Sequence, residues 1–299
     1  MSFLPIAIIA YALAAGSIVV DKILLKKSVQ DPAVFTFFVN ILQFAVILLI
    51  PFGFSFKWDT STYLALASGV ISVIALYTFF VSLKYNEAAL TGPLVGAFNP
   101  LAALLIEAFV LGQLLTSGQY LAIAVLIAGT IVFTHDQWIS RLQLNNRFAW
   151  IVASGILFGI SYVLLRQVFL ETSFVNGLVI SRLAAAAFAL AFLMLPSVRR
   201  QVFSPSSRSP IVSRSALALT IGAQAMGGAS GLLISFGITL ASASLVNSLF
   251  GVQYLVILAA ALIFAKKYPH LLEELSGKVI IQKIIGVAII SVGLYLLAK

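Results

Sequence analysis

Two ionisable residues lie well inside apolar segments of the sequence, where a charge is costly. Arg182 lies about eight residues into the segment 174–195, and its guanidinium could bind a carboxylate or another anion. Glu107, in the segment 88–112, could carry a proton or act as the counter-ion of Arg182. A buried structural role, with Arg182 paired to Glu107 or to helix carbonyl groups, is the alternative for both residues.

Uncharged polar side chains recur at helical spacing in both halves of the chain. Thr36, Asn40 and Gln43 are spaced i, i+4 and i+7, and Asn247 and Tyr254 also lie seven residues apart. Such faces can hydrogen-bond a solute or hold neighbouring helices together. We favour the solute, because the two faces come from opposite halves. Weaker candidates of the same kind are Tyr77, Asn99 and Gln253.

Four further residues could act in coupling or gating. Asp21 and Lys22 lie one turn before the end of the first apolar segment, where they could pair or titrate at a cavity mouth. An interfacial ion pair is the favoured alternative, since charges at span ends cost little. Pro93 and Pro100 interrupt the fourth segment and predict kinks, which could be hinges or could bend a helix around a cavity.

The sequence does not favour an enzyme. The two histidines, His135 and His270, lie in different predicted loops without metal-ligand spacing. The absence of cysteine removes thiolate nucleophiles, disulfides and cysteine metal sites. There is no G-x-S-x-G motif and no P-loop. We therefore expect no catalytic residues, no metal and no cofactor.

The composition is that of an integral membrane protein. Of the 299 residues, 62% are apolar and 9% are charged, whereas a soluble domain has about 45–50% apolar and about 25% charged residues. The mean hydropathy is +1.12. The net charge of +9 fits topology signals beside anionic headgroups better than nucleic-acid binding, so we expect a bilayer and no nucleic-acid partner.

Ten apolar segments approach the length that a helix needs to cross a bilayer, and their continuity favours helices over barrel strands. They are 4–25, 33–52, 63–83, 88–112, 119–134, 148–169, 174–195, 216–240, 243–265 and 281–298. The longer polar pieces, 197–215 and 266–280, are too short to bury a core, and we expect the first to be a mobile loop. The predicted fold is an all-α bundle of ten transmembrane helices.

The two halves of the chain resemble each other. A shift of 154 residues sets 87–113 over 241–267, and slightly shorter shifts align residues 17–27 with 160–170 and Pro51 with Pro196. Because five helices is an odd number, the second half enters the membrane with opposite polarity. We therefore predict two inverted five-helix repeats, 1–140 and 141–299.

Basic residues are concentrated on one predicted face of the membrane. The loops after spans 1, 3, 5, 7 and 9, with the adjoining span ends, carry 14 of the 18 lysines and arginines. The positive-inside rule makes this face cytoplasmic and places both termini outside. Trp58, Trp138 and Trp150 all lie at span ends, as expected for an interfacial belt.

The sequence resembles the EamA-type carriers of the drug/metabolite transporter superfamily over nearly its whole length. The segment NPLAALLIEAFVLGQLLTSGQ, from Asn99, is similar to the family pattern of a proline, an apolar run, Leu-Gly-Glu, a turn with threonine, and glutamine. The chain departs from this pattern at Gln113 and, in the second half, at Lys267. The resemblance implies ten helices in two inverted repeats, solute transport and, contrary to the charge distribution, cytoplasmic termini.

Taken together, these features predict a secondary transporter that moves an amino acid or a similar amphiphilic metabolite by alternating access. Its setting would be the inner or plasma membrane of a prokaryote, as a monomer or weak homodimer. A proton-coupled exporter of organic cations, relying on Glu107, is an alternative within the same class. A non-transporting membrane scaffold is the alternative from another class.

Overall fold

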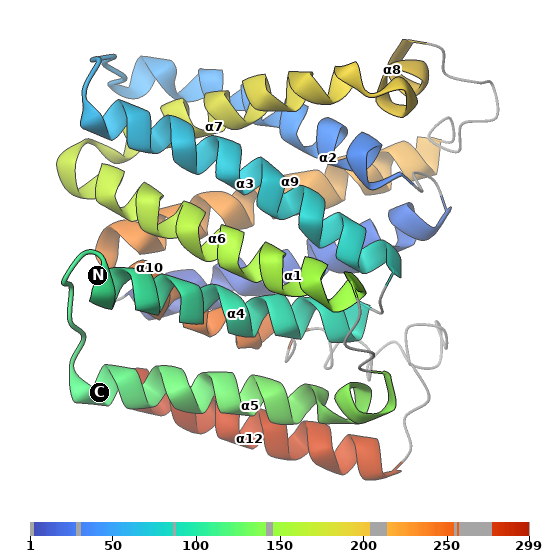
Figure 1. Ribbon diagram of the computed structural model, residues 1–299, viewed down its shortest axis with the longest axis vertical. Helices are drawn as coiled ribbons and strands as arrows, with labels where there is room; N and C mark the ends of the chain where they lie inside the picture. Colours follow the sequence, from blue (N-terminus) through green and yellow to red (C-terminus); the bar gives the residue numbers. More distant parts are fainter. Residues whose placement is uncertain are drawn as a thin grey trace.

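The computed structural model describes residues 3–27, 31–85, 88–141, 146–203, 214–253, 256 and 277–298, and all regular elements within these ranges are helical. The long helices run side by side, with their connections at two opposite ends of the bundle (Figure 1). Both marked chain ends lie at the same end, on the left of Figure 1. The helices are α1 (Phe3–Lys27), α2 (Pro32–Ile41), η1 (Leu42–Phe52), α3 (Thr60–Tyr85), α4 (Ala88–Phe109), α5 (Ser117–Arg141), α6 (Asn146–Glu171), α7 (Phe174–Ala189), η2 (Leu190–Met194), α8 (Pro196–Phe203), α9 (Arg214–Leu240), α10 (Ala243–Ser248), η4 (Leu249–Gly251) and α12 (Gly277–Ala298).

The prediction of an all-α protein with membrane-spanning helices is confirmed for the described residues. Five helical segments are long and apolar enough to cross a membrane: Pro32–Phe52, Thr60–Tyr85, Phe148–Glu171, Phe174–Met194 and Ile221–Leu240. Shorter apolar helical stretches lie within four other predicted spans: Phe3–Ile18, Leu94–Phe109, Ser117–Phe133 and Ile281–Gly293. The ninth predicted span begins with α10 and η4, and most of its remainder lies outside the described residues.

The second helix of each half begins with a capped turn and ends in a tighter 3₁₀ helix. The carboxylate of Asp31 accepts a hydrogen bond from the backbone N–H of Ala33 at 2.9 Å, and Pro32 supplies the first residue of α2. In α7, the Ser173 hydroxyl oxygen accepts from the N–H of Asn176. α2 continues into η1 and α7 into η2, so each pair forms one bilayer-length unit.

The expectation of a loop over 197–215 is wrong at both of its ends. α8 begins at Pro196 and ends at Phe203, and α9 already begins at Arg214. α8 forms because Val198 is fully buried and packs, together with Val202, in the apolar cluster at the start of α2. Tertiary burial therefore overrides the Ser, Pro and Arg composition that favours a loop.

Small residues allow α6 to pack tightly between α3 and α4. A Cβ atom on Gly159 would lie 2.7 Å from the carbonyl oxygen of Asn99, so only glycine permits this approach of α4. On the α3 side, the hydroxyl groups of Ser68 and Ser161 each donate to the other residue's carbonyl oxygen, at 2.9 and 3.0 Å. The interface between α3 and α6 is thus both close and polar.

Two other helix pairs complete the bundle. α1 packs against α9, where a Cβ on Gly227 would lie 2.9 Å from the hydroxyl oxygen of Ser17. α5 packs against α12 along the lower edge of Figure 1. α4 is helical from Ala88 through Pro93 and Pro100 to Phe109, so neither proline ends the helix.

Candidate functional site

Arg182 lies among neutral polar groups inside the bundle. Its guanidinium donates to Oε1 of Gln43 on η1 at 3.4 Å and to Oγ of Ser235 on α9 at 3.2 Å. Gly231 on α9 faces the guanidinium, since a Cβ atom at this position would be in van der Waals contact with Nη2 at 3.7 Å. No carboxylate of the described side chains lies within 4 Å of this cation, so the alternative of an ion pair with Glu107 does not describe this structure.

Gln43 connects Arg182 to a chain of hydrogen bonds along α2. Its Nε2 donates to Oδ1 of Asn40 at 2.6 Å, and Nδ2 of Asn40 donates to the carbonyl oxygen of Thr36 at 2.9 Å. The predicted face of Thr36, Asn40 and Gln43 is therefore continuous in the structure. It connects to Arg182 of the second half through Gln43.

A second polar chain joins α1, α4 and α10. The hydroxyl group of Tyr11 donates to Oδ1 of Asn247 at 3.3 Å, and Nδ2 of Asn247 donates to Oδ1 of Asn99 at 3.1 Å. All three side chains are almost completely buried. The chain therefore brings Asn99 and Asn247, one from each half, into contact.

Tyr162 on α6 packs against the buried cluster of side chains that contains Tyr11. Its ring stacks on Phe158 at a centroid distance of 6.3 Å. We call the set Tyr11, Asn40, Gln43, Asn99, Tyr162, Arg182, Ser235 and Asn247 the central polar cluster.

The sequence prediction missed three members of this cluster: Tyr11, Tyr162 and Ser235. Tyrosine and serine are common in apolar helices, and these residues form no helical spacing with the other candidates. Their roles arise from contacts between helices that are far apart in the sequence.

Three other predicted binding residues lie outside the cluster. The Tyr77 ring packs on Phe192 in an apolar environment, with a centroid distance of 5.6 Å. Gln253 is only 1% exposed, and neither polar atom of its amide has a hydrogen-bond partner among the residues that the structure describes. Tyr254 lies outside the described residues.

Glu107 contacts α10 instead of Arg182. Its carboxylate is 1% exposed and accepts hydrogen bonds from the backbone N–H of Ala243 at 2.7 Å and of Ser244 at 3.3 Å. It also accepts from the hydroxyl group of Ser244. A carboxylate at a helix N-terminus satisfies backbone donors that lack partners within the helix. Glu107 thus caps α10 from another helix.

The predicted gating residues are placed only in part. Asp21 and Lys22 belong to the last two turns of α1, but their side chains lie outside the described set, as does that of Pro93. Pro100 is buried in the middle of α4, next to Asn99. Of these four residues, the structure places only the side chain of Pro100, which follows Asn99 of the second polar chain directly in the sequence.

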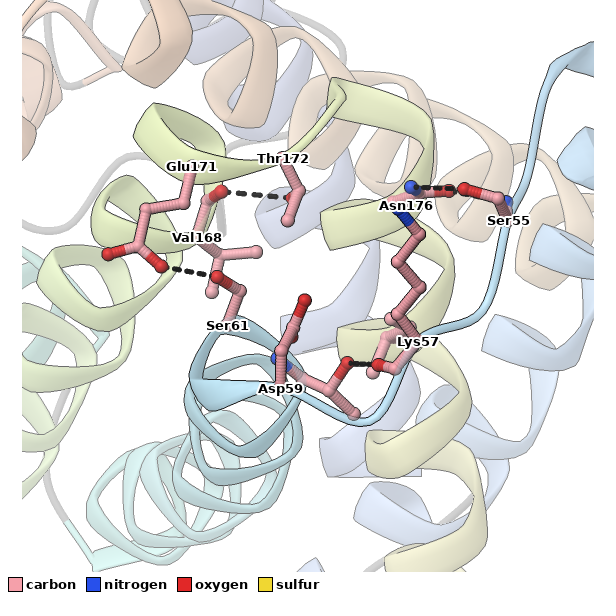
Figure 2. Close-up of a pocket in the computed structure, with 10 residues that line it drawn as sticks. Ser55, Lys57, Asp59, Ser61, Val168, Glu171, Thr172 and Asn176 are labelled. Carbon is pink, nitrogen blue, oxygen red and sulfur yellow. Dashed lines mark hydrogen bonds between the residues drawn. The ribbon is translucent and has the colours of Figure 1, made fainter.

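A cavity of about 160 Å³ opens at one end of the bundle, between the connection from η1 to α3 and the connection from α6 to α7. Figure 2 shows two hydrogen-bonded contacts across it, Ser61 with Glu171 and Ser55 with Asn176. The N–H of Ser55 also donates to Oδ1 of Asn176 at 2.8 Å. Its lining residues are Ser55, Lys57, Asp59, Ser61, Thr62, Val168, Glu171, Thr172, Asn176 and Ile180.

We call this set of contacts the end latch, because it ties residues 55–61 of the first half to residues 171–176 of the second. None of the residues predicted to act in binding or gating belongs to it. In the sequence, the only indication of a polar site at this end is that Lys57 and Asp59 lie in the short connection between two apolar segments.

No family model matches this chain, and no curated protein matches it. Twenty-eight chains of solved structures do match. One of them, a crystal structure, superposes with a TM-score of 0.66 over 99% of both chains, at 18% sequence identity. The chain is therefore similar in fold to a protein of solved structure over its full length.

Proposed function

We propose that this protein is a secondary transporter of the EamA type, which moves a small carboxylate-bearing metabolite through a site at Arg182. The observation that carries the proposal is a guanidinium inside the bundle whose hydrogen-bond acceptors, Gln43 and Ser235, are both neutral. An arginine at the centre of a membrane helix costs about 2.5–3.5 kcal/mol on insertion scales. An anionic group at this site would offset that cost, whereas neutral acceptors leave the charge uncompensated.

The packing pattern supports two inverted five-helix repeats. If the first five spans correspond in order to the last five, the contact of α3 with α6 corresponds to that of α9 with α1. The same correspondence maps the pairs α4 with α10 and α5 with α12 onto themselves. A pseudo-two-fold axis in the membrane plane relates helices in this way in transporters built from inverted repeats.

The central polar cluster lies where such repeats would meet. Asn99 meets Asn247, and Gln43 meets Arg182, so each of these contacts joins one half to the other. With one cation among amides and hydroxyl groups, the cluster suits a single carboxylate on an otherwise neutral or amphiphilic solute. An amino acid or a similar metabolite fits this description.

Asymmetry between the halves supports a conformation that is closed at one end. α3 packs closely on α7, where a Cβ on Gly69 would lie 2.2 Å from the carbonyl oxygen of Ser181. The corresponding pair, α9 and α2, makes no comparable contact among the described residues. The end latch lies beside the α3–α7 contact. In alternating access, α3 and α7 would separate while α9 and α2 come into close contact.

The alternative of a proton-coupled cation exporter has less support. It would require Glu107 to face the solute, but both carboxylate oxygens accept hydrogen bonds from α10. A non-transporting scaffold would not require an arginine inside the bundle without a carboxylate partner. Arg182 therefore favours a transporter over a scaffold.

Solute-induced thermal stabilisation of the purified protein tests the proposal. A ligand that binds the folded state raises the melting temperature. We expect stabilisation by amphiphilic carboxylates and not by their amides, lost in Arg182→Ala and partly kept in Arg182→Lys. Lys283→Gln, which removes a positive charge on α12, is the matched control. Stabilisation of Arg182→Ala equal to that of the unaltered protein would contradict the proposal.

A further inference from the structure

α8 presents two different sides. Val198 is 0% exposed and packs on the start of α2, whereas Arg199 and Arg200 are exposed. Phe203 is 69% exposed and lies four residues after Arg199, on the same side of the helix. The outer side of α8 therefore combines two cations with an aromatic ring.

The chain just before α8 marks where the lipid-facing surface ends. Met194, the last residue of the apolar span Phe174–Met194, is 85% exposed. The next residue, Leu195, is 42% exposed. Exposed apolar side chains on a membrane helix face acyl chains. The backbone N–H of Arg199 donates a hydrogen bond to the carbonyl oxygen of Leu195 at 3.0 Å, so Arg199 lies one helical turn after Leu195. The two arginines thus lie one turn beyond the apolar surface, where the headgroups of a surrounding bilayer would be expected.

Neither guanidinium forms a hydrogen bond or ion pair with any residue that the structure describes. Lys84 is exposed at the same end of the bundle, where α3 ends (Figure 1). Most of the basic residues of the sequence are predicted at this end. The local field therefore favours an anion, and an arginine fork matches the geometry of a phosphate.

We propose that α8 is an interfacial helix that binds the phosphate of an anionic phospholipid through Arg199 and Arg200. Phe203 and Met194 contact the acyl chains of the same lipid layer, as in amphipathic helices that lie in the plane of a membrane surface. α8 would then attach the C-terminal end of the span formed by α7 and η2 to the membrane surface. Arg182 lies on α7 of the same span. The inference does not depend on transport.

Lipid titration tests this proposal. The chain lacks cysteine, so Ser197→Cys, at an exposed position of α8, gives a single site for an environment-sensitive fluorophore. The full-length protein in neutral detergent is titrated with short-chain phosphatidylglycerol, with short-chain phosphatidylcholine and with inorganic phosphate. We expect a saturable response to phosphatidylglycerol alone. In Arg199→Gln/Arg200→Gln, binding should weaken by about 30-fold at low salt, given the usual contribution of two basic residues at an anionic surface.

The control is Lys57→Gln, which removes an exposed cation at the opposite end and should leave phosphatidylglycerol binding unchanged. An unchanged melting temperature shows that each variant is folded. Equal responses to phosphatidylglycerol and phosphatidylcholine would overturn the proposal, as would equal binding by the double variant. A response to inorganic phosphate as strong as that to phosphatidylglycerol would also overturn it, in favour of a soluble anion.

Discussion

The carboxylate of Glu107 joins α4 to α10, and its replacement should change stability more than solute recognition. Glu107→Ala leaves the N–H groups of Ala243 and Ser244 buried without an acceptor, at a cost of about 1–3 kcal/mol. Glu107→Gln keeps one acceptor oxygen and should cost less. Denaturant or thermal unfolding measures the difference. A proton-coupled exporter predicts the reverse, with stability kept and coupling lost in Glu107→Gln.

Tyr162 offers a residue-level test of the polar cluster. Tyr162→Phe keeps the ring that stacks on Phe158 and removes the hydroxyl group, which we expect to bind the solute. We expect solute affinity to fall about 2- to 10-fold, which is the usual effect of one neutral hydrogen bond. Tyr77→Phe, in apolar surroundings beside Phe192, should have no such effect. Equal affinities for the two variants would exclude Tyr162 from the site.

Single residues show what sequence could and could not predict about the site. Asn40 and Gln43 were predicted from their helical spacing, and Arg182 from the cost of a charge in an apolar segment. Tyr11 and Ser235 carry no such signal, because their partners, Asn247 and Arg182, lie on other helices. The role of Glu107 depends on where α10 begins relative to α4, which no local pattern contains.

At the level of helices, Gly69 sets the distance between α3 and α7. A Cβ at this position would lie 2.2 Å from the carbonyl oxygen of Ser181 and 2.9 Å from Cβ of Ala184. Because backbone must move, Gly69→Ala should destabilise the protein by about 1–3 kcal/mol. Gly228→Ala, with nothing within 4 Å of the new Cβ, is the control in the unfolding measurement. Equal stability of the two variants would show that the contact is not close.

The end latch predicts a conformational lock. Ser55→Cys with Asn176→Cys replaces a direct side-chain contact of 3.2 Å between the two halves, in a chain that has no other cysteine. Oxidation should form a disulfide and stop transport, and reduction should restore it. Each single-cysteine variant is the control for oxidation itself. Full transport by the oxidised double variant would show that this end need not open.

Helices were predicted better than their connections. Apolar length identified α3, α6 and α9 to within a few residues, because a membrane requires every backbone group in lipid to be bonded within the helix. α8 was predicted as a loop because of its serine, proline and arginine residues, whereas its stability comes from the burial of Val198. The 3₁₀ ends of the second and seventh spans also had no recognised signal.

For the whole molecule, the proposed repeat can be compared with the pattern of helix contacts. The pairs α3 with α6 and α1 with α9 correspond to each other when the halves are exchanged. The shift of 154 residues that aligns the fourth and ninth spans also aligns Asn99 with Gln253. The hydrogen bonding of these two side chains differs in the structure. Asn99 accepts a hydrogen bond from Asn247, whereas the amide of Gln253 has no hydrogen-bond partner in the described part of the chain. The proposed repeats are therefore not equivalent at this position.

The most direct test of the central claim is counterflow of a labelled amphiphilic carboxylate into proteoliposomes. The unaltered protein and Lys283→Gln should both accumulate the label. Arg182→Ala should lose at least about tenfold in rate, since a hydrogen bond to a charged group contributes about 1.5–3 kcal/mol, and Arg182→Lys should keep part of it. Unaltered counterflow by folded Arg182→Ala would contradict a carboxylate site at Arg182.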